Sequence, residues 1–159
     1  MKTLILMRHG HAYSAIQSGV ARDEDRPLSE DGVEGAIRAA AELKNRKIAL
    51  NAVIGSPLLR AVQTAREISG AFGLEPGVGQ YLGGGFSVSD MWERDIAPQL
   101  ARHDSVLVVG HLPGIGILAG TLLGKGELPL PAGGFYVLKL ETAPGKLEPG
   151  GATLDFAYI

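Results

Sequence analysis

Apolar and polar residues alternate along the chain in short blocks, and each block predicts a strand or a helix. Residues 3–7 and the segment "SVLVVG" at 105–110 are apolar almost throughout, which is typical of strands buried on both faces of a parallel sheet. The segment "NAVIGSP" predicts another short strand at 52–55. Apolar residues recur at helical spacing in three further segments, which we predict to be helices: 33–43, 58–68 and 115–122.

Capping and turn residues set the expected ends of these elements. Ser29 is the expected N-cap of the first long helix, because two acidic residues follow it. Ser56 is expected to cap the next helix and Pro57 to open it. The segment "LEPGVGQYLGGGFS" is rich in glycine and proline, and it leaves room for one short strand near 78–81. Ser87 or Ser89 then predicts the start of a helix that ends near Leu100.

The last third of the chain follows a different pattern. The segments "GGFYVLKLE" and "GATLDFAYI" alternate between apolar and polar residues, and "TAPGKLEPG" separates them. They predict an antiparallel pair of strands with one solvated face. Strands that alternate with helices predict a mainly parallel sheet with right-handed crossovers. We therefore expect an α/β fold with three layers, α/β/α, an antiparallel C-terminal edge and a single domain over residues 1–159.

Composition removes several classes of function. The net charge of −2 gives no electrostatic reason to expect nucleic acid or a membrane as a partner. The chain has no cysteine, which excludes disulfides, thiol nucleophiles and cysteine-bound metals. The apolar run near the N-terminus is too short for a signal sequence or a membrane span. We therefore expect a cytoplasmic protein.

The predicted strands end in chemically active residues. Arg8 and His9 follow the first strand, Arg60 lies one turn beyond the second, and His111 follows the strand at 105–110. Sites in parallel sheets form beyond the carboxyl ends of the strands, so we expect these side chains to meet. The polar loop at 11–27 adds Arg26.

Three arginines and two histidines repel one another unless an anion lies among them. The planar guanidinium group suits phosphate oxygens, and a neutral imidazole is a competent nucleophile. Gly10 would allow the backbone to approach a ligand closely, and Ser56 is a further candidate contact. The cluster therefore predicts a phosphate site that contains a reactive histidine.

Four motifs then show a resemblance. "LMRHGHA", "RPLS", "SPLLRAVQTA" and "VVGHLPG" are similar, in this order, to the signatures of the histidine phosphatase superfamily. The short chain and the "RPLS" and "GHLPG" elements resemble its SixA-type phosphohistidine phosphatases. The resemblance implies a phosphoglycerate mutase-like fold and a phosphatase that needs neither metal nor cofactor. It also implies a substrate that is a phosphorylated protein, such as a signalling domain that carries phosphohistidine, or a small phosphate ester.

The resemblance also implies roles for single residues. His9 matches the nucleophile that becomes phosphohistidine. Arg8 and Arg60 match the arginines that bind phosphate, and Arg26 matches the additional arginine of the SixA type. His111 matches the second histidine, which stabilises the transferred group.

One position departs from the pattern of relatives that cleave phosphate esters. Such relatives carry a carboxylic acid after the third strand, and this chain places Gln80 or Tyr81 there. An alkoxide leaving group has a conjugate-acid pKa of ~15.7, whereas that of imidazole is ~6.5. A phosphohistidine substrate therefore needs little help from an acid. Three carboxylates in this region remain candidates for this role: Glu75, Asp90 and Glu93.

Other interpretations stay open on the sequence. His9, His11 and His111 could form a three-histidine zinc site, although the arginines oppose a dication. Alternatively, His11 lies at the mouth of the pocket. Arg26 could instead form an ordinary ion pair with Glu24 or Asp25, which lie next to it in "RDEDRP". Rival functions are a phosphatase or mutase that acts on small molecules and a non-catalytic module that binds phosphoproteins.

Overall fold

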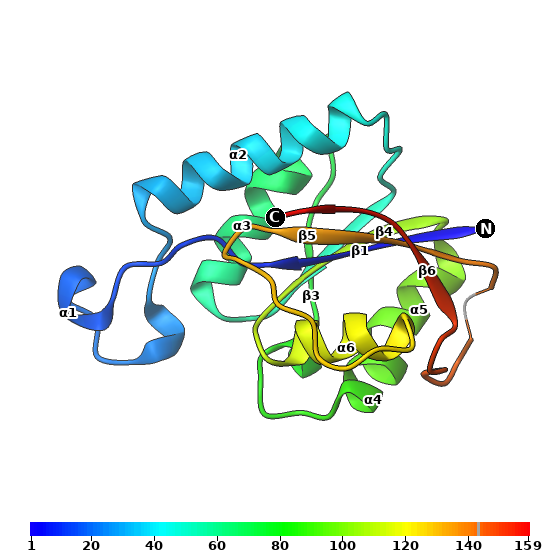
Figure 1. The fold of residues 1–159 in the computed structure, drawn as a ribbon. Helices are drawn as coiled ribbons and strands as arrows, with labels where there is room; N and C mark the ends of the chain where they lie inside the picture. The colour runs from blue at the N-terminus through cyan, green and yellow to red at the C-terminus, as the bar shows by residue number, and fades with distance from the viewer. Residues whose placement is uncertain (143) are drawn as a thin grey trace.

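Six strands form one mixed sheet between two layers of helices in the computed structural model, which describes residues 1–142 and 144–159 (Figure 1). The strand order is β3-β2-β4-β1-β5-β6, with β1 to β4 mutually parallel where they pair and β5 antiparallel to both of its neighbours. This arrangement confirms the predicted α/β class and its antiparallel C-terminal edge. The strands are β1 Lys2–Arg8, β2 Ala52–Gly55, β3 Gly77–Val78, β4 Ser105–Gly110, β5 Phe135–Leu140 and β6 Ala152–Tyr158.

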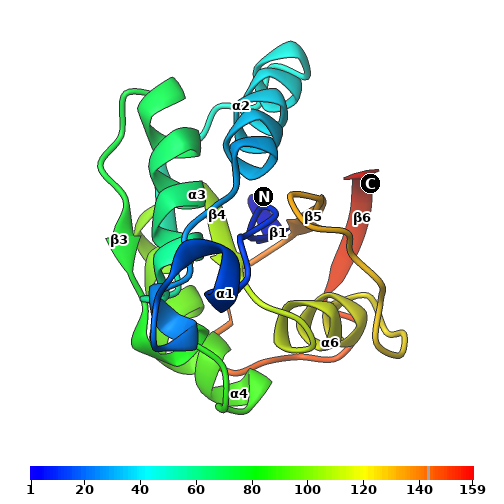
Figure 2. The ribbon, with the colours of Figure 1, turned by 90° about the vertical axis from the view of Figure 1, so that its left-hand side faces the viewer.

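The helices cover both faces of this sheet. α2 and α3 lie over one face and α4, α5 and α6 lie over the other, while α1 projects beyond the carboxyl ends of the parallel strands (Figures 1 and 2). The helices are α1 Ala15–Ser18, α2 Glu30–Asn45, α3 Leu59–Ala71, α4 Val88–Asp90, α5 Ala97–Arg102 and α6 Gly114–Leu122. A π-helical stretch, Met91–Ile96, joins α4 to α5, and the 3₁₀ turns are Asp23–Asp25 and Gln80–Leu82. No helix in these described parts of the chain has both the length and the apolar character needed to cross a membrane.

The position of β1 in the centre of the sheet explains why its residues are apolar. Leu4 and Leu6 pack with the layer of α5 and α6, whereas Ile5 and Met7 pack with the layer of α2 and α3. All four side chains are fully buried, so neither face of the strand tolerates a polar residue. Polar residues can therefore enter only where the strand ends, and Arg8 is its last residue.

Two predicted element boundaries are wrong, for local reasons. α3 begins at Leu59, with Leu58 rather than Ser56 at the N-cap, because the Ser56 hydroxyl accepts the Leu58 N–H and bonds to His111. β3 covers only Gly77–Val78, and the residues after it turn into a 3₁₀ helix. Ser87 does cap the helical segment that follows, as predicted. The predicted connection at 142–150 includes residue 143, which lies outside the described residues.

Candidate active site

The carboxyl ends of β1 and β4 and the first turn of α3 surround a cavity of about 390 Å³. Figure 2 looks onto this edge of the sheet, with α1 in front. Five of its lining residues are ones that the sequence predicted: Arg8, His9, Arg26, Arg60 and His111. The others are Asp23, Leu58, Gly83, Gly84 and Leu112. The fold therefore brings the predicted arginines and histidines into one place.

His9 is held in the form that a nucleophile needs. Its Nδ1 lies 2.8 Å from the carbonyl oxygen of Gly10. Because a carbonyl can only accept a hydrogen bond, Nδ1 carries the proton and Nε2 keeps its lone pair. Burial lowers the pKa of His9, the hydrogen bond to Gly10 opposes this shift and the nearby arginines add to it, so that the pKa is about 4. The ring is therefore neutral at pH 7 without a bound anion.

His111 faces His9 across the cavity. The two ring centroids lie 5.0 Å apart, with an angle of 54° between the ring planes. The Nε2 atom of His111 lies 2.7 Å from the hydroxyl of Ser56, which fixes the orientation of the ring. Burial, followed by the charge of His9, lowers the pKa of His111 to about 3. Nε2 faces this buried hydroxyl, so Nδ1 is the nitrogen that remains for a ligand.

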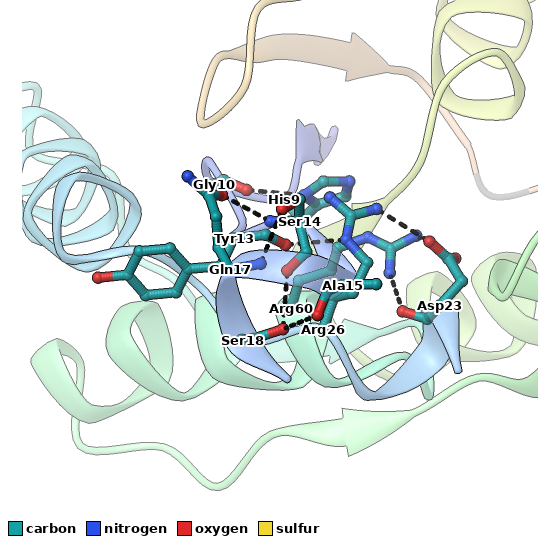
Figure 3. Close-up of polar contacts among 10 residues, drawn as sticks. All are labelled: His9, Gly10, Tyr13, Ser14, Ala15, Gln17, Ser18, Asp23, Arg26 and Arg60. Carbon is teal, nitrogen blue, oxygen red and sulfur yellow. Dashed lines mark hydrogen bonds and ion pairs between the residues drawn. The ribbon is translucent and has the colours of Figure 1, made fainter. Parts of the chain in front are cut away.

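Arg60 and Arg26 converge on a single carboxylate, that of Asp23 (Figure 3). Arg60 donates to Oδ2 of Asp23 at 3.0 Å and to its backbone oxygen at 2.9 Å. Arg26 donates to Oδ1 at 2.9 Å, and its Nε donates to the carbonyl of Tyr13 at 2.8 Å. These two arginines lower the pKa of Asp23, which is therefore ionised at pH 7. The guanidinium groups are thus placed to bind two oxygens of one anion.

Arg8 supplies the third positive charge. Its NH1 donates to the carbonyl of Leu130 at 3.1 Å, which fixes the guanidinium group at the end of β1. Its Nε is buried and has no hydrogen-bond partner among the described residues. A buried donor that lacks a partner carries a cost in free energy.

Comparisons with known proteins support this reading of the geometry. Residues 4–82 match the sequence profile of the histidine phosphatase superfamily (branch 1). Phosphohistidine phosphatase SixA of Escherichia coli (strain K12) is 33% identical over an alignment of 129 residues, which covers 79% of this chain and 76% of that protein. The chain belongs to the histidine phosphatase superfamily.

Two solved structures have the same fold as this chain. A structure of the protein histidine phosphatase SixA complexed with tungstate superposes with a TM-score of 0.81 at 26% identity, covering 98% of this chain and 96% of that one. Mycobacterial glucosyl-3-phosphoglycerate phosphatase superposes with a TM-score of 0.70 at 20% identity, covering 98% and 97% of the two chains, and shows a likeness of fold alone. The phosphoglycerate mutase-like fold that the motifs imply is thereby confirmed.

Gly10 serves the packing of the loop after β1, whereas the sequence predicted that it would approach a ligand. It does not line the cavity, and a Cβ at this position would lie 2.9 Å from the carbonyl oxygen of Gly32 and 3.2 Å from Leu28. The missing side chain allows the loop after β1 to pack against the start of α2. The Gly10 N–H donates to the Thr64 hydroxyl at 3.0 Å, which connects the loop after β1 to α3.

Ser56 also acts differently from the prediction. Its side chain is fully buried and does not line the cavity, so a direct contact with phosphate does not fit this structure. Its hydroxyl instead holds His111. Ser56 is therefore a positioning residue.

His11 contacts the start of α2 and does not line the cavity that contains His9. Its Nδ1 lies 2.7 Å from the hydroxyl of Ser29, the N-cap of α2. His11 is not part of the cavity lining, which corrects the interpretation that placed it at the mouth. Over residues 1–142 and 144–159, no three histidine or acidic side chains lie close enough together to hold a metal ion.

The acidic residues on either side of β3 do not line the cavity. Neither Gln80 nor Tyr81 lines it, and nor do the three acidic candidates in this region, Glu75, Asp90 and Glu93. Asp95 accepts the backbone N–H of Tyr81 at 2.8 Å, and burial raises its pKa. Within the described residues, Asp23 is the one carboxylate that lines the cavity, and the sequence analysis missed it.

A second hollow adjoins the first. It has a volume of about 350 Å³ and shares His111, Leu112 and Gly84 with the arginine cavity. The side chains that give it its apolar character are Leu82, Phe86, Val88, Met91, Pro113 and Ile117. A ligand whose phosphoryl group binds the arginines could therefore place an apolar group here.

Proposed function

We propose that this protein is a phosphatase that works through a phosphohistidine intermediate on His9 and removes phosphate from phosphohistidine on a protein. The observation that carries the proposal is that His9 is neutral, with an unprotonated Nε2, and lines the same cavity as three arginines. The similarity to SixA of E. coli supports the choice of phosphohistidine as substrate.

The chemistry follows from the placement of these groups. The arginines bind the phosphoryl oxygens, on which charge accumulates during transfer. His9 Nε2 attacks phosphorus while the P–N bond of the substrate breaks, and the leaving imidazole takes a proton from solvent. Water then attacks the phosphorus of phosphorylated His9. The second P–N bond breaks and phosphate leaves. The attacking water releases one proton to solvent, which balances the proton taken up by the leaving imidazole.

Among the described residues, no acidic side chain after β3 lines the cavity, which supports a P–N bond as the target. The leaving-group pKa values differ by roughly 9 units, which corresponds to at most about 12 kcal/mol of leaving-group stabilisation. Even a third of this difference would separate phosphohistidine from an alkyl phosphate by a large factor in rate. The positive charge that stabilises the transferred group comes from the arginines.

One observation favours a second candidate, a phosphatase for aryl phosphates. The apolar hollow beside His111 is large enough for an aromatic ring, and an aryl oxide is a better leaving group than an alkoxide. In the first candidate, the same hollow would receive an apolar side chain next to the phosphohistidine.

Trapping the intermediate tests the proposal. The protein is incubated with a phosphohistidine peptide, with p-nitrophenyl phosphate or with glycerol phosphate, each with and without a chelator. We expect acid-labile, alkali-stable phosphate on the chain, lost in His9→Ala, with fast turnover of the peptide and slow turnover of glycerol phosphate. Preference for the aryl ester supports the second candidate. If the protein binds phosphate but is neither phosphorylated nor active on any of the three substrates, it is a non-catalytic binding module and the proposal is wrong.

A further inference from the structure

Asp23 occupies the place between Arg26 and Arg60 that suits an anionic ligand. Its two carboxylate oxygens accept from different arginines, Oδ1 from Arg26 at 2.9 Å and Oδ2 from Arg60 at 3.0 Å (Figure 3). A phosphoryl group can present two oxygens to two guanidinium groups in the same manner. We propose that Asp23 is an internal competitor, whose carboxylate the substrate must displace and which returns when phosphate leaves.

The need for such a group follows from the burial of Arg60. Its side chain is only 9% exposed, and a guanidinium group so far from water requires a counter-ion. Arg8 and Arg26 line the same cavity and add to the positive charge. Asp23 satisfies this requirement in the absence of a ligand. A bound phosphoryl dianion would satisfy it instead, and the two anions would repel each other across the same guanidinium group.

The carboxylate can leave without disturbing the turn that carries it. The Asp23 side chain is 61% exposed, and its hydrogen bonds within the described residues go to the two arginines alone. Its backbone oxygen separately accepts from Arg60 and from the N–H of Arg26. Rotation of the side chain into solvent therefore frees both guanidinium groups while the backbone of the loop stays in place.

The competition would determine which ligands bind well. A free phosphate ion has to replace Asp23 using its own charge alone. A phosphoryl group on a docked protein brings further contacts, which offset the cost of displacement. Asp23 thus weakens product inhibition by phosphate and favours substrates that bind outside the arginine cavity as well. This inference rests on the proposed function, since it requires that the arginines bind a phosphoryl group.

Asp25 provides a matched control in the same 3₁₀ turn. Its carboxylate pairs with Arg22 at 3.2 Å, and it does not line the cavity. Asp23→Asn and Asp25→Asn each remove one negative charge from the turn. Only the first removes a charge that competes for the arginines of the site, so general electrostatic effects cancel in the comparison.

Calorimetric titration with inorganic phosphate and with tungstate tests the proposal on the parent protein, Asp23→Asn, Asp23→Ala and Asp25→Asn. We expect both Asp23 variants to bind phosphate about 5- to 20-fold more tightly than the parent, since about 1–2 kcal/mol of ion pairing no longer has to be broken. Asp25→Asn should stay within about twofold, because its ion pair is exposed and lies outside the cavity. The inhibition constant of phosphate in the turnover assay should fall in parallel with its dissociation constant.

Two results would overturn the proposal in different ways. If the parent binds tungstate and the Asp23 variants bind it equally or more weakly, Asp23 orients the arginines rather than competing for them, and the proposed function is unaffected. If none of the four proteins binds either anion, the phosphate site itself is wrong and both proposals fall.

Discussion

The site has two halves that are built in different ways. His9 and His111 follow strands of the buried sheet, and each ring is fixed by one short hydrogen bond, to Gly10 or to Ser56. Arg26 and Asp23 lie on the long loop after β1, with side chains that are 27% and 61% exposed. The sheet therefore fixes the two histidines to which we assign the chemistry, whereas an exposed loop carries Arg26, to which we assign phosphate binding, and its partner Asp23.

The difference extends to charge. Burial keeps both histidines neutral, which preserves the lone pair on His9 that the proposed reaction requires. The arginines keep their charge, and a nearby carboxylate balances it until a ligand arrives. Arg60 connects the two halves, because it lies in the first turn of α3 and contacts the loop through Asp23. If this division is correct, substitutions on the buried side should cost more than those on the loop.

The sharpest test compares Arg60→Ala with Arg26→Ala. Arg60 is buried and fixed by its helix, so we expect its loss to lower kcat/KM by about 100- to 1000-fold, as for a preorganised oxyanion donor. Arg26 is more exposed, so we expect Arg26→Ala to lower kcat/KM by about tenfold. Arg22→Ala, on the same loop and paired with Glu24 and Asp25, should change kcat/KM less than twofold, since exposed pairs contribute about 0–1 kcal/mol. Equal losses for Arg60 and Arg26 would contradict the division.

Sequence analysis predicted the buried half of the site better than its loop. Strand ends are visible in a local pattern, because an apolar run stops where polar residues begin, and parallel strands bring such ends together. Asp23 was missed because the turn contains three acidic residues in succession, and only the 3₁₀ geometry decides which of them faces the arginines.

The contacts of Gly10 and Ser56 could not be predicted from the neighbouring sequence either. Gly10 packs against Gly32 of α2, and Ser56 bonds to a histidine 55 residues away. Neither partner lies within a sequence window that periodicity or capping rules examine. The same limit explains the misplaced start of α3, since the Ser56 hydroxyl is engaged by His111 and Leu58 instead of capping the helix.

The neutral histidines predict a loss of stability in acid. The pKa of His111 is about 3 in the folded state, against 6.5 in an unfolded chain, so the unfolded state binds more protons between these values. The free energy of unfolding should therefore fall as the pH drops from 6.5 towards 3. A shift of this size corresponds to roughly 4–5 kcal/mol in a sealed site, and solvent in the open cavity should reduce it to about 2 kcal/mol.

Urea unfolding at a series of pH values measures this loss. His111→Gln removes the titrating group, so its free energy of unfolding should fall less steeply between pH 6.5 and pH 4 than that of the parent. Parallel curves for the two proteins would show that His111 titrates normally. Nuclear magnetic resonance of the His9 ring provides a separate check, since the ring should stay neutral down to about pH 5.

Gly10→Ala tests the packing next to His9, the proposed nucleophile. The new Cβ would lie 2.9 Å from a backbone oxygen, so the loop or α2 must shift, at a cost of about 1–3 kcal/mol in the free energy of unfolding. The shift should also move His9 and lower kcat. Gly70→Ala in α3 is the control, because its Cβ would meet nothing within 4 Å and alanine favours a helix by about 1 kcal/mol. A fully active, stable Gly10→Ala would mean that this contact is not needed.

Ser56→Ala should produce the smallest effect and the most specific one. Without the hydroxyl, His111 loses the bond at Nε2, and a net hydrogen bond contributes about 1 kcal/mol, which corresponds to roughly a five- to tenfold lower kcat. KM should change little, because the arginines still bind the substrate. Ser69→Ala removes another buried hydroxyl of the same size, which bonds within α3 to Arg66, and it should leave kcat unchanged. If both variants lose activity equally, the effect is one of general packing; if Ser56→Ala alone does, the buried half positions His111 through this serine.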